Sequence, residues 1–191
     1  MSNAILVEDV GRSVVVKFNR PETRNPLSIA VLESLFEIVA DTALRPEIAS
    51  LVFTGTSGVF ASGADLREIA AVAGGDEAIE FALRGQRLMN AIAELGCETV
   101  AAVNGLCFGG ALDLALSCKK RIASPEAVFS HPGATLGIMT GWGGTQRLTR
   151  LIGEPMSLEM FFTAKRLNAH EALSIGLVSA IADDPLDLAL N

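Results

Sequence analysis

The chain has 191 residues, of which half are hydrophobic and 19% are charged, and its formal net charge is −7. This charge argues against a nucleic acid or an anionic membrane as a bulk partner. The uncharged stretches 99–112 and 127–146 are too short, or too rich in glycine and polar residues, for membrane spans, and no signal peptide is visible. We therefore expect one globular domain over residues 1–191, with no membrane partner.

The numbers of cysteines and histidines indicate the redox environment of the protein and bear on whether it binds a metal. The three cysteines are an odd number without C-x-x-C spacing, which favours a reduced, cytoplasmic protein. Only two histidines are present, so we expect no metal site.

The first half of the sequence predicts a β-hairpin followed by alternating helices and strands. Apolar, β-branched residues flank Gly11, and Ser28 is a suitable N-cap for an amphipathic helix. Loops are expected at 19–26, which contains two prolines, and at 73–76. The predicted elements are strands 5–10 and 13–18, helix 28–42, strand 49–54, a short helix 66–71 capped by Asp65, and a long helix 76–95.

The second half continues the same alternation. Its predicted elements are strand 99–103, helix 110–118, strands 121–123 and 127–129, helices 144–152, 155–163 and 169–173, and strand 177–180. Mostly apolar strands that alternate with helices are typical of an α/β domain whose strands are buried and largely parallel.

Two segments share one design, in which a buried strand leads into a glycine-rich turn that begins a helix. The first passes through Gly63-Ala64 and the second through Gly109-Gly110. Free N–H groups at a helix N-terminus bind anions, and two such turns facing each other would form an oxyanion hole from backbone donors alone. The alternative is that both turns are tight connections without a catalytic role.

Five segments together resemble the crotonase (enoyl-CoA hydratase/isomerase) superfamily. They are NRPETRNPLS (19–28), FASGADL (60–66), AVNGLCFGGALDLA (102–115), LGIMTGWGGTQRL (136–148) and LNAHEALSIGLV (167–178). Each match is weak alone, but together they cover nearly the whole chain in order. The resemblance implies an α/β fold with a crotonase-like (ClpP/crotonase) core of repeated ββα units.

The resemblance also implies an acyl-CoA substrate and its contacts. The backbone N–H groups of Ala64 and Gly110 would hold the thioester oxygen while an enolate forms. Arg24 and Arg67 are candidate phosphate partners, although solvated surface charge is the alternative for both. The CoA thioester would be the substrate, with no separate cofactor. The nucleotide would lie along Glu22, Thr23, Arg24, Ala64, Asp65, Leu66 and Arg67.

Hydratases of this superfamily use two glutamates, and neither position holds a glutamate in this sequence. The first position matches Asp113, one helical turn after Gly110, so a carboxylate there would face the same cavity. A buried aspartate that favours the helix dipole is the alternative. The second position matches Gly133, which we place at the substrate site but which moves no proton. The paired-carboxylate mechanism therefore does not carry over intact.

Other polar and aromatic residues fall near these motifs. His131 is a candidate base near neutral pH, or a hydrogen-bonded structural histidine. Thr140 can exchange a hydrogen bond but cannot serve as a base. Trp142, Phe108 and Met139 are expected to line or close a pocket, unless they only fill the core.

We therefore expect an acyl-CoA enzyme of the enoyl-CoA hydratase/isomerase type that uses Ala64, Gly110 and Asp113. The alternatives are an acyl-CoA binder with little catalysis, or another enolate reaction such as decarboxylation or hydrolysis. A Ser/His peptidase fits less well, because no G-x-S-x-G motif and no third orienting residue are present. The resemblance also implies a homo-oligomer, a trimer or hexamer, although the C-terminal trimerisation helices of the superfamily are expected to be largely absent.

Overall fold

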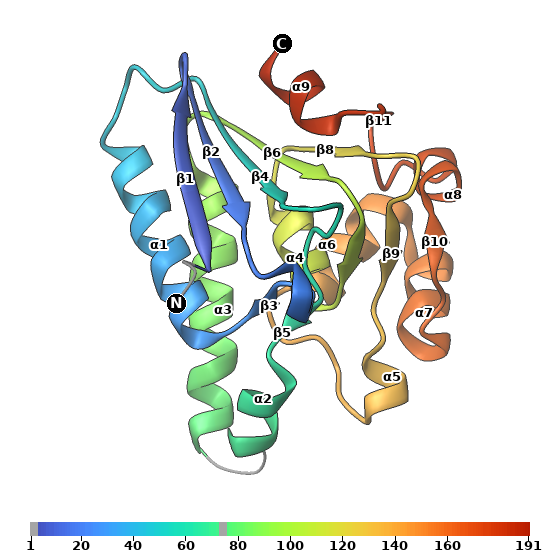
Figure 1. The fold of residues 1–191 in the computed structure, drawn as a ribbon. Helices are drawn as coiled ribbons and strands as arrows, with labels where there is room; N and C mark the ends of the chain where they lie inside the picture. Colours follow the sequence, from blue (N-terminus) through green and yellow to red (C-terminus); the bar gives the residue numbers. More distant parts are fainter. Residues whose placement is uncertain (1–3, 73–75) are drawn as a thin grey trace.

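The computed structural model describes residues 4–72 and 76–191, and its centre is a six-stranded sheet (Figure 1). The strand order is β1-β2-β4-β6-β8-β11. Strands β1 and β2 form an antiparallel hairpin, and every other neighbouring pair in this sheet is parallel. The strand bounds are β1 Ile5–Val10, β2 Ser13–Phe18, β4 Ser50–Gly55, β6 Glu98–Val103, β8 Lys120–Ala123 and β11 Ala180–Ile181.

Short strands outside this sheet complete a repeated ββα pattern. A long strand of the main sheet is followed by a short strand and then a helix, as in β6–β7–α4 and β8–β9–α5. The short strands pair with one another in the orders β10-β9-β7 and β3-β5. Their bounds are β3 Pro26–Leu27, β5 Gly63–Ala64, β7 Leu106–Phe108, β9 Val128–Ser130 and β10 Leu167–Asn168. The α/β fold with repeated ββα units is thereby confirmed.

Helices cover both faces of the main sheet. Ser28 caps α1 by accepting a hydrogen bond from the Val31 N–H group, and Asn168 and Glu171 form a capping box at α8. The helix bounds are α1 Ile29–Ala43, α2 Leu66–Val72, α3 Asp76–Glu94, α4 Gly110–Ser117, α5 Gly133–Leu136, α6 Gly144–Ile152, α7 Glu154–Thr163, α8 Ala169–Ser174 and α9 Pro185–Leu190, with a short 3-10 turn at Pro21–Thr23.

The alternation of side chains along each strand divides the core between the two faces. Leu51 and Phe53 of β4 point into the large core shared with α1, α3 and α4. Val52, between them, belongs to a smaller cluster on the opposite face, against which Leu186 of α9 packs. Figure 1 shows α9 lying over that second face, away from α1 and α3. The larger core therefore holds the glycine-rich turns in place.

Most predicted elements are confirmed, and the differences have local causes. The strand predicted at 177–180 is wrong, because the N–H groups of Leu177 and Val178 bond to Ala172 O and strand pairing begins only at Ala180. The sequence did not predict the short strands β3, β5, β7 and β10, nor the helices α5 and α9. The predicted loop at 73–76 lies outside the described residues except for Asp76, which begins α3.

No helix within residues 4–72 and 76–191 combines the length and apolar character needed to cross a bilayer.

Phe53 tests how strongly the central strand depends on this core. Its side chain is fully buried, so Phe53→Ala is expected to lower the free energy of unfolding by about 3–5 kcal/mol. The matched control is Phe162→Ala, because Phe162 is 69% exposed and its truncation should change stability by no more than about 0.5 kcal/mol. Urea denaturation measures both; equal losses would contradict the assignment of the core.

Candidate active site

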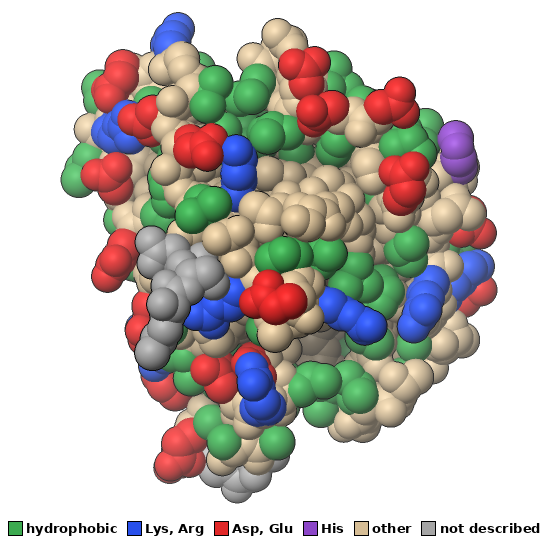
Figure 2. Space-filling view, in the orientation of Figure 1, with side chains coloured by type: hydrophobic (Ala, Val, Ile, Leu, Met, Phe, Trp, Pro, Cys, Tyr) green, Lys and Arg blue, Asp and Glu red, His purple; other side chains and the backbone are tan. Residues whose placement is uncertain are grey.

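A cavity of about 700 Å³ opens beside the two glycine-rich turns. Its wall comes from β5, α2, α3, the start of α4 and the segment 131–142, with Phe161 of α7. Most of the wall is apolar. Figure 2 shows several Lys and Arg side chains across the middle of the same view of the molecule, although the chain carries a net charge of −7. The cavity thus offers an apolar interior with Arg67 on its wall.

The two glycine-rich turns pack backbone against backbone at the cavity wall. Ala64 and Gly110 both line the cavity. A Cβ atom added to Gly110 would lie 3.2 Å from Ala64 N, and one added to Gly63 would lie 2.9 Å from Gly110 N. The Gly110 N–H group is in the first turn of α4, where N–H groups have no intrahelical acceptor. The two backbone nitrogens therefore lie close together on one wall, and we call them the donor pair.

Backbone geometry and hydrogen bonds hold the second turn in position. Gly109 has a φ of 51° and a ψ of −121°, which favours glycine. Its N–H group donates to Ser130 O at 2.9 Å, so the turn is tied to β9. Gly63, with a φ of 95°, would place a Cβ atom 2.5 Å from Phe108 O. Side chains are thus excluded on both sides of the contact.

Trp142 closes one side of the cavity against two glycines. A Cβ atom on Gly110 would lie 2.3 Å from its ring, and one on Gly85 of α3 would lie 2.2 Å from it. The Phe81 ring lies 5.7 Å away, centroid to centroid. Trp142, Phe108 and Met139 all line the cavity, as the sequence predicted. Sequence reasoning missed Phe81 and Phe161, whose helical positions gave no signal beyond ordinary amphipathic spacing.

The Asp113 carboxylate lies behind the cavity wall, so the expectation that it faces the cavity is wrong. Every residue of α4 is buried, and Asp113 has no exposed surface. The Thr140 hydroxyl donates a hydrogen bond to its Oδ2 atom. Its Oδ1 atom packs so closely on Gly144 that a Cβ atom there would lie 1.9 Å away. Burial raises the pKa of Asp113 to about 7, although the hydrogen bond from Thr140 favours the ionised form.

His131 lines the cavity but is almost wholly buried. Its Nε2 atom lies 3.6 Å from Asp113 Oδ1, beyond hydrogen-bond distance, and its ring lies 5.0 Å from that of Phe161. Among the described residues neither ring nitrogen has a hydrogen-bond partner, so the hydrogen-bonded structural alternative is wrong. Burial lowers the pKa of His131 to about 4. The imidazole is therefore neutral and weakly basic at neutral pH, which does not fit a base that titrates near neutrality.

Gly133 lines the cavity at the start of α5. A Cβ atom there would lie 2.4 Å from Ile138 O, and the Ile138 N–H group donates to Gly133 O at 3.0 Å. The turn between Gly133 and Ile138 therefore leaves no space for a side chain at position 133. The position is shaped for glycine, so restoring a glutamate here would require the backbone to move.

The predicted CoA residues divide into two groups. Thr23, Asp65, Leu66 and Arg67 line the cavity, whereas Glu22 and Arg24 are exposed and are not on its wall. Arg67 donates to both carboxylate oxygens of Asp65, at 3.0 and 2.7 Å, and this contact lowers the pKa of Asp65.

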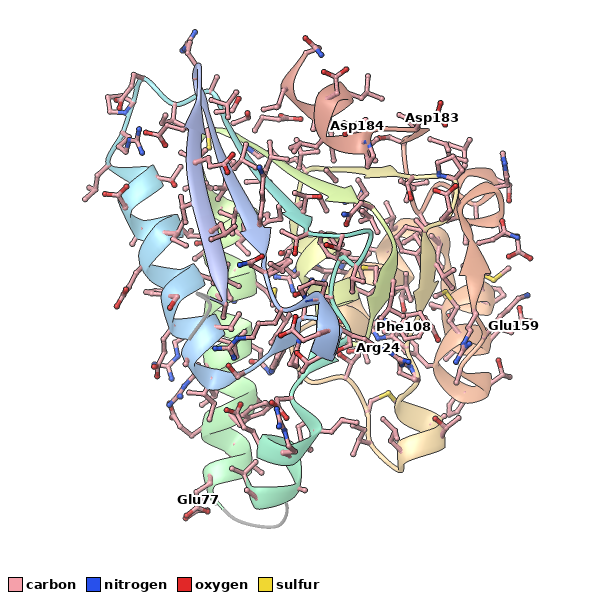
Figure 3. All side chains as sticks on the ribbon, viewed as in Figure 1. Arg24, Glu77, Phe108, Glu159, Asp183 and Asp184 are labelled. Carbon is pink, nitrogen blue, oxygen red and sulfur yellow. The ribbon has the colours of Figure 1, made fainter. Side chains whose placement is uncertain are left out.

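Arg24 is differently placed. Its carbonyl accepts from Ser62 N, and its side chain has no acidic partner among the described residues. The Phe108 N–H group bonds to Ala61 O, the residue before Ser62. Figure 3 accordingly shows Arg24 and Phe108 close together. Within the described chain Arg24 is thus a cation without an acidic partner near the cavity, and the guanidinium that lies over the Phe108 ring is that of Arg166, 5.4 Å from the ring centroid.

The raised pKa of Asp113 predicts a pH-dependent cost to stability. The unfolded carboxyl ionises near pH 3.8 and the folded one near 7, so the cost grows across this range and reaches on the order of 4 kcal/mol above it. Asp113→Asn removes the ionisation. The variant is expected to gain stability relative to the unaltered protein as pH rises from 4 to 8. His131, whose lowered pKa destabilises the fold as pH falls, is present in both proteins. Urea denaturation at each pH measures the difference; a constant difference would contradict the assignment.

Gly85 tests the closure of the cavity by Trp142. Gly85→Ala is expected to displace the indole, because no space exists for the added methyl group. Trp142 is the only tryptophan and is 3% exposed, so its fluorescence emission should move to longer wavelength. Gly96→Ala is the control, because a Cβ atom there meets nothing within 4 Å. The same emission from both variants would contradict this packing.

Comparisons with known proteins agree with this arrangement. The family model described as enoyl-CoA hydratase/isomerase matches residues 11–187. The short-chain-enoyl-CoA hydratase of Clostridium acetobutylicum is 36% identical over 182 residues, covering 95% of this chain and 69% of that protein. The crotonyl-CoA hydratase of Syntrophomonas wolfei is 36% identical over 181 residues, covering 93% and 68%.

Solved structures give the same result. DspI of Pseudomonas aeruginosa superposes with a TM-score of 0.93 at 32% identity, covering 99% of this chain and 78% of that one. An enoyl-CoA hydratase of Bacillus anthracis superposes with a TM-score of 0.91 at 32% identity, covering 98% and 74%. The fold, the matched length and the sequence identity together show that the chain belongs to the enoyl-CoA hydratase/isomerase family of the crotonase superfamily.

Proposed function

We propose that the chain binds acyl-CoA thioesters and stabilises a thioester enolate with the backbone N–H groups of Ala64 and Gly110. The observation that supports this most is the close packing of the two turns at the wall of an apolar cavity. When an enolate forms, negative charge collects on the thioester oxygen. Each N–H group aimed at that oxygen contributes about 3 kcal/mol to transition-state stabilisation, and the N-terminus of α4 adds its positive dipole.

The two ends of the substrate would meet different surroundings. The acyl chain would occupy the apolar cavity, whose size is usual for a small-molecule site. The CoA portion would extend out of the cavity along Thr23, Asp65 and Leu66. Arg24 is the more available phosphate partner, because Arg67 already bonds to Asp65. The thioester is itself the substrate in this scheme, which calls for no separate cofactor.

The reaction is of the enoyl-CoA hydratase/isomerase type, but it does not use two carboxylates at the cavity wall. Gly133 supplies none, and Asp113 lies behind the wall. These two observations also favour a second candidate, an acyl-CoA protein that binds without hydrating, or one that uses the enolate for decarboxylation or hydrolysis. Association into trimers or hexamers stays a prediction from the resemblance.

Gly110→Ala tests the donor pair. The added methyl group would collide with Trp142 and lie 3.2 Å from Ala64 N, so binding of butyryl-CoA and turnover of crotonyl-CoA should both fall. A loss of one donor corresponds to a rate lowered by about 100-fold or more. Calorimetry gives the affinity, and the loss of enoyl absorbance gives the turnover.

Gly96→Ala, away from the cavity, is the matched control and should behave like the unaltered protein. The proposal fails if the unaltered protein binds no CoA thioester. Binding without turnover of crotonyl-CoA would select the second candidate. Full activity in Gly110→Ala would remove the donor pair from the mechanism.

A further inference from the structure

A buried acid and a cavity-lining hydroxyl are joined by a hydrogen bond next to the donor pair. Thr140 lines the cavity, and its Oγ1 atom donates to Asp113 Oδ2. Asp113 stands one helical turn after Gly110 in α4. Within the described part of the chain, Thr140 is the one cavity-lining side chain that is hydrogen-bonded to Asp113. The carboxylate is thus separated from the reacting region by a single hydroxyl group.

We propose that Thr140 is a catalytic residue, passing a proton between the α-carbon of the bound thioester and Asp113, which acts as a positioning and proton-storing residue behind the wall. This inference rests on the proposed enolate chemistry and names a further residue for it. It also accounts for an aspartate at a place that the substrate does not reach.

The proton transfer balances in both directions. To protonate the enolate, the hydrogen of the Thr140 hydroxyl moves to the α-carbon, where a C–H bond forms. At the same time the Asp113 carboxylic acid gives its hydrogen to Thr140 Oγ1, so the negative charge of the enolate ends on the carboxylate. Removal of an α-proton runs in reverse and begins with ionised Asp113. A hydroxyl group is suited to this exchange because it both donates and accepts.

The surroundings of Asp113 support the role. With the pKa of the carboxyl raised to about 7, both protonation states are populated near neutral pH. The groups that face it are the Thr140 hydroxyl, neutral His131, the Cys107 thiol of β7, whose pKa burial raises, and Arg147 of α6, whose charge favours the ionised form. The backbone N–H groups of Trp142 and Gly144 also favour the ionised form, and burial opposes them.

His131 is the rival route, and the geometry favours Thr140. The imidazole Nε2 atom is 3.6 Å from Asp113 Oδ1, beyond a hydrogen bond. Its pKa of about 4 makes the neutral ring a poor proton acceptor near neutrality. Thr140 already holds the hydrogen bond along which a proton would move.

The test is exchange of the α-protons of butyryl-CoA in D₂O, followed by NMR. Thr140→Val, which removes the hydroxyl, should slow exchange by about 100-fold or more, while the affinity for butyryl-CoA stays unchanged. Thr140→Ser should restore most of the rate. Thr163→Val is the control, since Thr163 is exposed on α7 and its hydroxyl donates to Glu159 O of the same helix. The rate profile of the unaltered protein should bend near pH 7, and this bend should be missing from the residual rate of Thr140→Val.

Asp113→Asn provides a second variant if Thr140→Val does not fold. It keeps an acceptor for the Thr140 hydroxyl but cannot carry the proton, so it should lose the same exchange with affinity retained. Unchanged exchange in either variant overturns the relay, as does a serine variant no faster than the valine one. Binding without exchange by the unaltered protein overturns the relay alone. Failure to bind any CoA thioester overturns the proposed function and the relay with it.

Discussion

The contact of two backbone turns without intervening side chains is the constraint on which the rest of the site depends. The turn at Gly63-Ala64 and the turn at Gly109-Gly110 approach so closely that a single added methyl group would collide with backbone or with Trp142. The contact requires glycine at positions 63 and 110, because a Cβ atom added to Gly63 would lie 2.9 Å from Gly110 N and one added to Gly110 would lie 3.2 Å from Ala64 N. The parallel strands β4 and β6 deliver the turns to the same edge of the sheet, and Trp142 fixes the position of Gly110 from the cavity side.

A second constraint is electrostatic. The core that holds α4 in place also removes Asp113 from water, and the cost of burying its charge is only partly offset by the hydrogen bond from Thr140. The same burial lowers the pKa of His131. The fold thus keeps an acid and a base side by side, both predominantly neutral in mildly acidic solution. Stability and reactivity are linked here, since ionising the acid weakens the fold and supplies the proton acceptor of the proposed relay.

Much of the fold was predictable from local sequence, and the donor pair from recurrent motifs. The hairpin, the Ser28 cap and the strands feeding the glycine-rich turns follow from residues near one another in the chain. The side-chain chemistry was not predictable in the same way. Spacing alone placed Asp113 one turn after Gly110, but the direction in which its side chain points depends on packing around α4. Its hydrogen-bond partner Thr140 lies 27 residues away in the sequence. Likewise, the requirement for glycine at position 85 follows only from the packing of α3 against the Trp142 ring.

The central claim is that the backbone N–H groups of Ala64 and Gly110 hold the thioester oxygen. The most direct measurement is the ¹³C NMR shift of butyryl-CoA labelled at the carbonyl carbon and bound to the protein. Two hydrogen bonds to the oxygen polarise the carbonyl, so the account predicts a downfield shift on binding that Gly110→Ala abolishes. A carbonyl shift that stays at its free value while the thioester is bound would contradict the account.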